Sequence, residues 1–229
     1  MTYARHALSA ALIVCLMTPV LQAQYKSEYR VFQIKVDNTE AGTYTQTITT
    51  YGEGTTDMVG KSDLKLKVLG ITYQQAYRGQ ERWKDGKLLH LSSASNDNGT
   101  THTLLVNADR GRLQVKEGGK ERTANADAWS SSYWTLPSAE QRSKASYLID
   151  ADSGMEYQVT WQNMGKDMLI VAGQRVSCTH YKVTGNNLTT PGTNLTADVW
   201  FDENDRLVKR QGPRKGKTIT LQLVSATVR

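Results

Sequence analysis

The sequence contains very little cysteine, with only Cys15 and Cys178 among its 229 residues. Cys15 lies in an apolar N-terminal stretch, so the rest of the chain has a single thiol and no internal disulfide. The stability of residues 24–229 must therefore come from a hydrophobic core. Cys178 and His180 are two residues apart on an expected strand, which is too far for a thiolate–imidazole pair, and a buried structural thiol is the default reading.

Long hydrophobic runs are absent beyond the N-terminus. The first 23 residues contain basic Arg5 and His6, a largely apolar run from Ala7 to Leu21, and small Ala23. This layout is typical of a secretory signal peptide, and the run is too short to span a bilayer comfortably. We therefore expect cleavage after Ala23, export, and a monomeric protein without stable membrane insertion.

Several motifs of catalysis and nucleotide binding are also missing. The sequence has no Gly-x-Ser-x-Gly elbow, no phosphate-binding glycine loop and no dinucleotide fingerprint. The net charge is +6, with basic and acidic residues interleaved. The densest basic patch, "GPRKGK" at 212–217, is interpreted as a solvated hairpin tip, and nucleic acid is not an expected partner.

Short runs rich in Thr, Val, Tyr and Trp dominate the chain, and clusters of Gly, Asn and Asp separate them. This punctuation favours an antiparallel meander. We expect a mainly β protein in which a strongly curved antiparallel sheet, or half-open β-barrel, contains about a dozen strands. The expected strands are 28–36, 42–51, 56–70, 71–83, 87–95, 100–108, 112–118, 155–161, 167–173, 174–185, 196–202, 206–212 and 217–226.

Glycine-containing pairs mark the expected turns, because tight hairpins need residues with positive φ. These turns are Asp85-Gly86, Arg110-Gly111, Gly118-Gly119 and Asn163-Met164-Gly165.

One connector, residues 123–147, interrupts the strands of a single β domain at 24–229. Within it, Ser138 and Gln141 match a capping box and predict a short helix at 139–146. We expect this helix to cover one face or one open end of the sheet.

The richest polar stretch is "ERWKDGKLLHLSSASNDNG" at 81–99. A two-residue turn at Asp85-Gly86 would pair Trp83 with Leu88 and Glu81 with His90. Glu81 and His90 would then be either an acid–base pair or, the favoured reading, a structural pair beside a packed Trp. A bulge in the hairpin would break that pairing.

Metal sites are not expected in this stretch. Asn96-Asp97-Asn98-Gly99 lacks the spaced acids of a calcium loop and is interpreted as a four-residue turn, which would pair Ser95 with Thr100. Strand parity places His90 and His102 on opposite faces, which denies them a shared zinc ion.

Aromatic residues crowd into the connector, where Trp129, Tyr133 and Trp134 stand close together in sequence. Core packing explains most such residues. The alternative is that this serine-rich connector forms a mobile lid over an apolar pocket.

The motifs "ERWKDGKLLHLSSASNDNG", "SSYW", "VWFDENDRLVK" and "GKTITLQLVS" resemble an uncharacterised family of exported bacterial proteins, domain of unknown function 6134. The likeness runs from about Tyr29 to the C-terminus. The stretch "VDNTEAGTY" departs from it, because it lacks an Asp-Gly tip between the first two strands. The resemblance implies a periplasmic or secreted location and a curved sheet similar to the half-barrels of lipoprotein carriers that hold an acyl chain. It supplies no catalytic residue.

These observations favour a soluble, non-catalytic binding or carrier module for an apolar or amphiphilic ligand such as a lipid, with no cofactor. The expected ligand-binding residues are Glu81, Trp83, Asn96, Tyr133 and Trp134. Two alternatives stay open: an envelope hydrolase that uses Glu81 with His90 or another acid pair, and a scaffold that binds a protein through an exposed strand edge.

Overall fold

The computed structural model describes residues 25–68 and 71–229, and the expected signal peptide lies outside this part of the chain. The described residues form fifteen strands and one short helix. Their bounds are β1 (Lys26–Val36), β2 (Thr39–Thr50), β3 (Thr55–Val68), β4 (Ile71–Lys84), β5 (Lys87–Asp97), β6 (Thr100–Asp109), β7 (Arg112–Glu117), β8 (Lys120–Asn125), β9 (Trp129–Ser130), α1 (Ala139–Ser143), β10 (Ser146–Ile149), β11 (Glu156–Val171), β12 (Gln174–Asn187), β13 (Asn194–Phe201), β14 (Leu207–Arg214) and β15 (Lys217–Val228).

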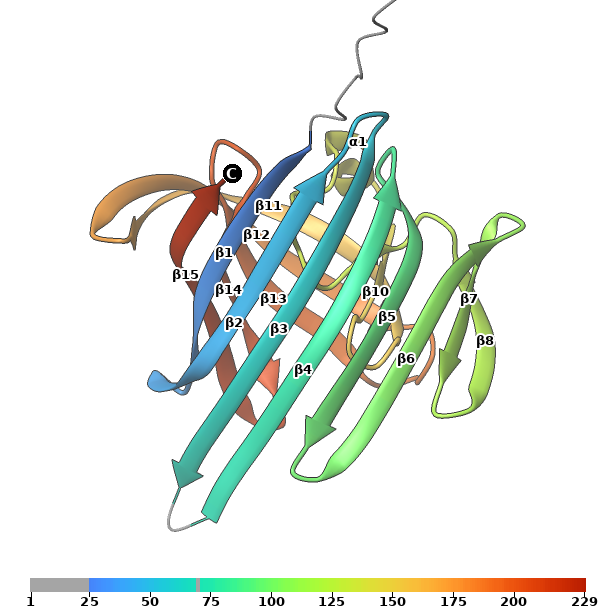
Figure 1. Ribbon diagram of the computed structural model, residues 1–229, viewed down its shortest axis with the longest axis horizontal. Coiled ribbons are helices and arrows are strands. Elements are labelled where there is room, and N and C mark those ends of the chain that lie inside the picture. Colours follow the sequence, from blue (N-terminus) through green and yellow to red (C-terminus); the bar gives the residue numbers. More distant parts are fainter. Residues whose placement is uncertain (1–24, 69–70) are drawn as a thin grey trace, which may run out of the picture.

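All fifteen strands belong to one sheet, in the order β8-β7-β6-β5-β4-β3-β2-β1-β15-β14-β13-β12-β11-β10-β9. Neighbours are antiparallel, except that β9 and β10 run parallel. The first and last strands of the chain therefore lie side by side in the middle of the sheet, and a meander extends from each of them (Figure 1). The predicted mainly β class, with a strongly curved antiparallel sheet, is confirmed.

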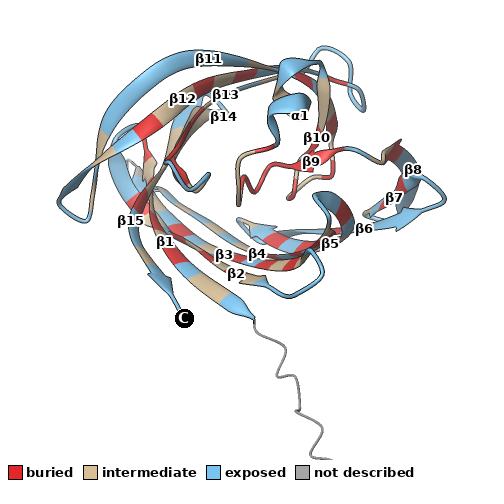
Figure 2. Cartoon of the chain, turned by 90° about the horizontal axis from the view of Figure 1, so that it is seen from above, coloured by how far each residue is buried: buried red, intermediate tan, exposed pale blue. Residues whose placement is uncertain are grey.

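The sheet curls around an interior, so that β1 to β5 face β11 to β14 (Figure 2). Its two end strands, β8 and β9, do not pair with each other, so no backbone hydrogen bonds close the barrel between them. The chain between β8 and β10 turns into the interior, and α1 lies near one end of the barrel (Figures 1 and 2). Among the described residues, no helix is long and apolar enough to cross a membrane.

Alternating burial along the strands shows that the inner face of the curled sheet is covered. In β1, Phe32, Ile34 and Val36 are buried while the residues between them are partly exposed, as expected for a strand with one covered face. The buried residues form two clusters. One surrounds Phe32, Tyr133 and Phe201, and the other surrounds Trp83 and Trp129.

Two local predictions were wrong. Asn163-Met164-Gly165 is not a hairpin turn but a bulge inside the continuous strand β11, because Asn163 pairs with Tyr181 and Gly165 with His180. Gly165 has a φ of 104° and donates its N–H to Asn163 Oδ1, so the backbone N–H at the bulge has a hydrogen-bond partner within the same strand. Helix α1 has the predicted capping box but ends at Ser143, since the following residues soon join β10.

The close approach of β2 and β3 at Gly42 generates a testable prediction. A Cβ on Gly42 would lie 2.0 Å from the carbonyl oxygen of Asp63, whereas a Cβ on Gly52 would meet nothing within 4 Å. We expect Gly42→Ala to lower the free energy of unfolding by about 1–3 kcal/mol. Chemical denaturation measures this change, and the matched control Gly52→Ala should stay within about 0.5 kcal/mol of wild type. Equal stability of the two variants would contradict this close approach of the two strands.

Candidate ligand-binding cavity

The curled sheet encloses a cavity of about 740 Å³, which is within the size range of small-molecule sites. Inward-facing residues of β1, β3, β13 and β15 give it an apolar wall, because alternate side chains of a strand share a face. These apolar residues are Ile34, Val36, Leu64, Leu66, Leu195, Ile219 and Leu221.

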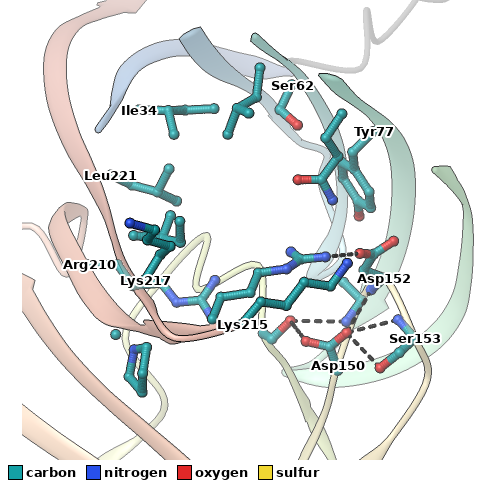
Figure 3. A pocket seen from close by; sticks show the side chains of 18 of the residues that line it. Ile34, Ser62, Tyr77, Asp150, Asp152, Ser153, Arg210, Lys215, Lys217 and Leu221 are labelled. Carbon is teal, nitrogen blue, oxygen red and sulfur yellow. Dashed lines mark hydrogen bonds and ion pairs between the residues drawn. The ribbon is translucent and has the colours of Figure 1, made fainter. Parts of the chain in front are cut away.

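Three ion pairs gather at the charged end of the cavity, where the β14–β15 hairpin turns, and Figure 3 draws Asp152, Lys215 and Lys217 from these pairs. Each joins a basic residue of "GPRKGK" to an acid from a different strand, turn or loop. The pairs are Arg214–Asp152 at 2.9 Å, Lys215–Asp97 at 2.6 Å and Lys217–Asp37 at 2.8 Å. The basic patch is exposed, as predicted for a hairpin tip, but it also lines the cavity and ties the β14–β15 turn to β5 across the barrel.

A polar loop faces the cavity from the segment after β10. The carboxylate of Asp150 accepts hydrogen bonds from the hydroxyls of Ser131 and Ser153 and from the backbone N–H groups of Asp152 and Ser153. All four donors are neutral, and they hold the loop in a tight turn beside the charged end.

Tyrosine side chains complete the lining. Burial raises the pKa of Tyr44 to about 12 and that of Tyr77 well above its ordinary value. Both hydroxyls therefore stay protonated and offer polar contacts within an otherwise apolar wall. Their positions depend on Gly60 and Gly79, where a Cβ would lie 2.7 Å from Tyr44 Oη and 2.1 Å from Tyr77 Oη.

Ser131 and Ser132 of the inner segment, residues 128–134, form the floor of the cavity, and side chains of four strands hold this segment and the adjoining loop in place. Gln46 on β2 donates to the carbonyl of Ser132 at 2.9 Å, and Arg30 on β1 donates to the carbonyl of Trp134 at 2.5 Å. Ser93 on β5 donates to the carbonyl of Ala151 in the adjoining loop at 2.6 Å. The fourth contact comes from Glu81 on β4.

Glu81 on β4 is a buried acid that contacts the inner segment directly. Its carboxylate accepts hydrogen bonds from Ser130 Oγ at 2.6 Å, from Trp83 Nε1 at 2.8 Å and from Ser132 Oγ at 3.2 Å. Burial without a cation raises the pKa of Glu81 to about 7, although the three hydrogen bonds lower it in part. The ring of Trp83 packs 4.5 Å from that of Trp129, centroid to centroid.

The structure places four of the five expected ligand-binding residues around the inner segment and the fifth elsewhere. Glu81, Trp83 and Tyr133 are buried and Trp134 is half-buried, while Asn96 lies on the outer face and accepts a hydrogen bond from the N–H of Gly99 at 2.7 Å. None of the five lines the cavity. Their roles in ligand binding stay predictions, but burial of residues 128–133 favours core packing over a mobile lid.

The predicted pairing of Glu81 with His90 is wrong. A bulge between Arg82 and Trp83 shifts the register, so that Glu81 pairs with Leu91 and Arg82 pairs with His90. Glu81 therefore points inward, while His90 points outward and lies 2.8 Å from Asn107 Oδ1. The acid–base pair on which one hydrolase hypothesis depended does not form.

The second turn of this stretch is also shorter than predicted. Asp97 pairs with Thr100 and Ser95 with His102, so the turn has two residues, Asn98 and Gly99, instead of four. His90 and His102 still occupy opposite faces. Within the described residues, no three His, Cys, Asp or Glu side chains form a group suited to a metal ion.

The sequence reading missed the polar residues of the cavity itself, above all Arg210 and Asp150. A signal was available for Arg210, because Arg210, Gly212 and Arg214 alternate along β14 and all three line the cavity. The interpretation of "GPRKGK" as a turn did not include the inward-facing residues of β14 that precede this turn.

The curled fifteen-stranded sheet and its cavity place the protein in the class of barrel-like β-sheet proteins. The chain belongs to the family DUF6134, a domain of unknown function, whose family model matches residues 32–224. No curated protein matches the sequence.

Two solved structures resemble the fold. A beta-barrel-like protein of domain of unknown function DUF1849 from Brucella abortus has a TM-score of 0.56 and 9% sequence identity, over 90% of this chain and 98% of that chain. This likeness shows the fold alone. LprF from Mycobacterium bovis matches with a TM-score of 0.32 and 12% identity, over 87% of this chain and 84% of that chain, which is too distant to support an argument.

The raised pKa of Glu81 makes a prediction about pH. Its pKa is about 7 in the folded protein, against an ordinary value of 4.5, so its contribution to stability is full below pH 4.5 and is lost as pH rises to about 7. The loss amounts to about 3 kcal/mol. We expect Glu81→Gln to remove this fall, since an amide stays neutral at every pH.

Denaturation at pH 4.5, 6 and 8 measures the effect. The control is Glu140→Gln on α1, because Glu140 is exposed and pairs with Lys144. This control should keep the wild-type loss of stability between pH 4.5 and 8. A Glu81→Gln variant with the same loss would show that Glu81 does not titrate in this range.

Proposed function

We propose that this protein is an exported, non-catalytic binding or carrier protein that holds an amphiphilic ligand in the cavity of its curled sheet. The observation that carries the proposal is the division of the cavity into an apolar wall and a charged end. Seven aliphatic side chains line the wall, and four basic residues of the β14–β15 hairpin line the charged end: Arg210, Arg214, Lys215 and Lys217.

Two physical arguments support this assignment. An apolar ligand chain would leave water for the aliphatic wall, which is favourable by about 25 cal/mol for each Å² buried. A polar group at the other end of the same molecule would keep hydrogen-bonding partners among the charged side chains, so it would escape the cost of burying an unpaired polar group.

The location is part of the same proposal. The N-terminal stretch predicts export, and an extracytoplasmic protein that carries a poorly soluble molecule needs an enclosed apolar space for it. The interior of this sheet offers such a space, while the inner segment and its hydrogen bonds supply a fixed floor.

Filling the cavity tests the proposal. We expect residues 24–229 of the wild-type protein to bind a fluorescent fatty acid and to carry lipid in native mass spectrometry after purification from envelope extracts. The double variant Leu66→Trp/Leu221→Trp places two large rings against the apolar wall and should weaken binding at least about tenfold by removing the space for the ligand.

The matched control is Lys67→Trp/Val224→Trp, which puts the same rings on exposed neighbours of the same two strands. This control should bind the probe like the wild type. Equal binding by both double variants, with both folded by circular dichroism, would locate the probe outside the cavity. No binding by the wild-type protein would refute the proposal.

A further inference from the structure

Arg210 differs from the other arginines of its segment. It lies half-buried on the inner face of β14 and lines the cavity. Four residues to either side, Arg206 bonds the carboxylate of Asp202 at 2.8 Å and Arg214 bonds that of Asp152 at 2.9 Å. Arg210 forms no ion pair and no side-chain hydrogen bond with any residue that the structure describes.

The ring of Tyr133 holds the Arg210 side chain in place. The guanidinium carbon lies 5.3 Å from the centroid of this fully buried ring, in a cation–π contact. Such a contact uses the charge of the guanidinium and leaves its N–H donors free for an acceptor. A half-buried guanidinium with a fixed position and unused donors is a preformed site for an anion.

The other charged groups that line the cavity already have partners. Arg214, Lys215 and Lys217 pair with Asp152, Asp97 and Asp37. The remaining acid, Asp150, accepts four hydrogen bonds from neutral donors of its own loop and of Ser131. Figure 3 shows Arg210 and Asp150 on different sides of the cavity.

The register of the sheet places Arg210 next to the apolar wall. Arg210 is the direct partner of Leu221 in the β14–β15 pair, and Gly212 is that of Ile219. Both Leu221 and Ile219 belong to the wall. An alkyl chain attached to a group bound by the guanidinium would therefore contact the aliphatic side chains of the wall directly.

We infer that the cavity selects amphiphiles with an acidic head group, a carboxylate or a phosphate, and that Arg210 binds this group while the chain lies along the wall. The inference rests on the proposed function and specifies its ligand class. Arginine suits this role because its planar fork donates two parallel hydrogen bonds to either anion.

Three probes with the same kind of chain separate the head groups: oleate, oleyl alcohol and an oleoyl lysophosphatidic acid, each measured by displacement of a fluorescent fatty acid. The wild-type protein should bind at least one acidic probe about tenfold or more tightly than oleyl alcohol, as expected for a charge-assisted hydrogen bond. Tight binding of oleate alone assigns a carboxylate site, and tight binding of lysophosphatidic acid alone assigns a phosphate site.

Replacement of the guanidinium then tests the residue. Arg210→Gln should weaken the acidic probe about tenfold and leave oleyl alcohol unchanged, while Arg210→Lys keeps a charge and should retain part of the preference. The charge-matched control Arg112→Gln removes an exposed cation on β7 and should change neither affinity.

The outcomes distinguish this inference from the proposed function. Equal wild-type affinities for oleate, lysophosphatidic acid and oleyl alcohol would overturn the acidic selectivity and leave the carrier proposal standing. A preference that persists unchanged in folded Arg210→Gln would overturn the role of Arg210. Absence of binding for all three probes would refute the carrier proposal and this inference together.

Discussion

The contact between Glu81 and the inner segment is the constraint on which the barrel depends. The two end strands of the sheet never pair, so backbone hydrogen bonds cannot close it. Side chains do so instead, because Glu81 on β4 binds Ser130 of β9 and Trp83 packs against Trp129. This closure places a carboxyl group in an apolar interior, where only neutral hydrogen-bond donors compensate for lost hydration.

The same closure defines the cavity. Because Gln46, Glu81 and Arg30 hold the inner segment against β1, β2 and β4, the segment fills one part of the barrel and leaves the other part hollow. The hollow part lies toward the β14–β15 turn, where three ion pairs tie this hairpin to Asp152 after β10, to Asp97 at the end of β5 and to Asp37 after β1. Exposed ion pairs contribute little stability individually, about 0–1 kcal/mol each. Their main effect is to arrange charge at one end of an apolar space.

The sequence predicted the features that arise from local pattern. Alternation of apolar residues located most strands, and Ser138 with Gln141 located the start of α1, because strand pleat and helix capping act over a few residues. The bulge at Leu89 was named only as an alternative, although Leu88 and Leu91 are both buried at a spacing of three, which strict alternation does not allow. In the sequence alone, this spacing does not fix the register of the β4–β5 hairpin. Only packing against Trp83 and the inner segment decides that register. Arg210 was missed for a related reason, since its significance comes from the absence of a partner, which depends on every strand that faces it.

The pairing of β1 with β15 has a consequence for how the chain folds. Tyr29 lies beside Thr227 and Ile34 beside Leu221, so contacts at the centre of the sheet join residues that are nearly the whole chain apart. Such long-range contacts slow folding, because the entropy of closing a long loop is lost before the contacts form. Until its C-terminal residues emerge from the ribosome, the chain cannot complete its central ladder, and β1 has an unpaired edge. Incomplete chains therefore remain open at the centre of the sheet until the last strand has been synthesised.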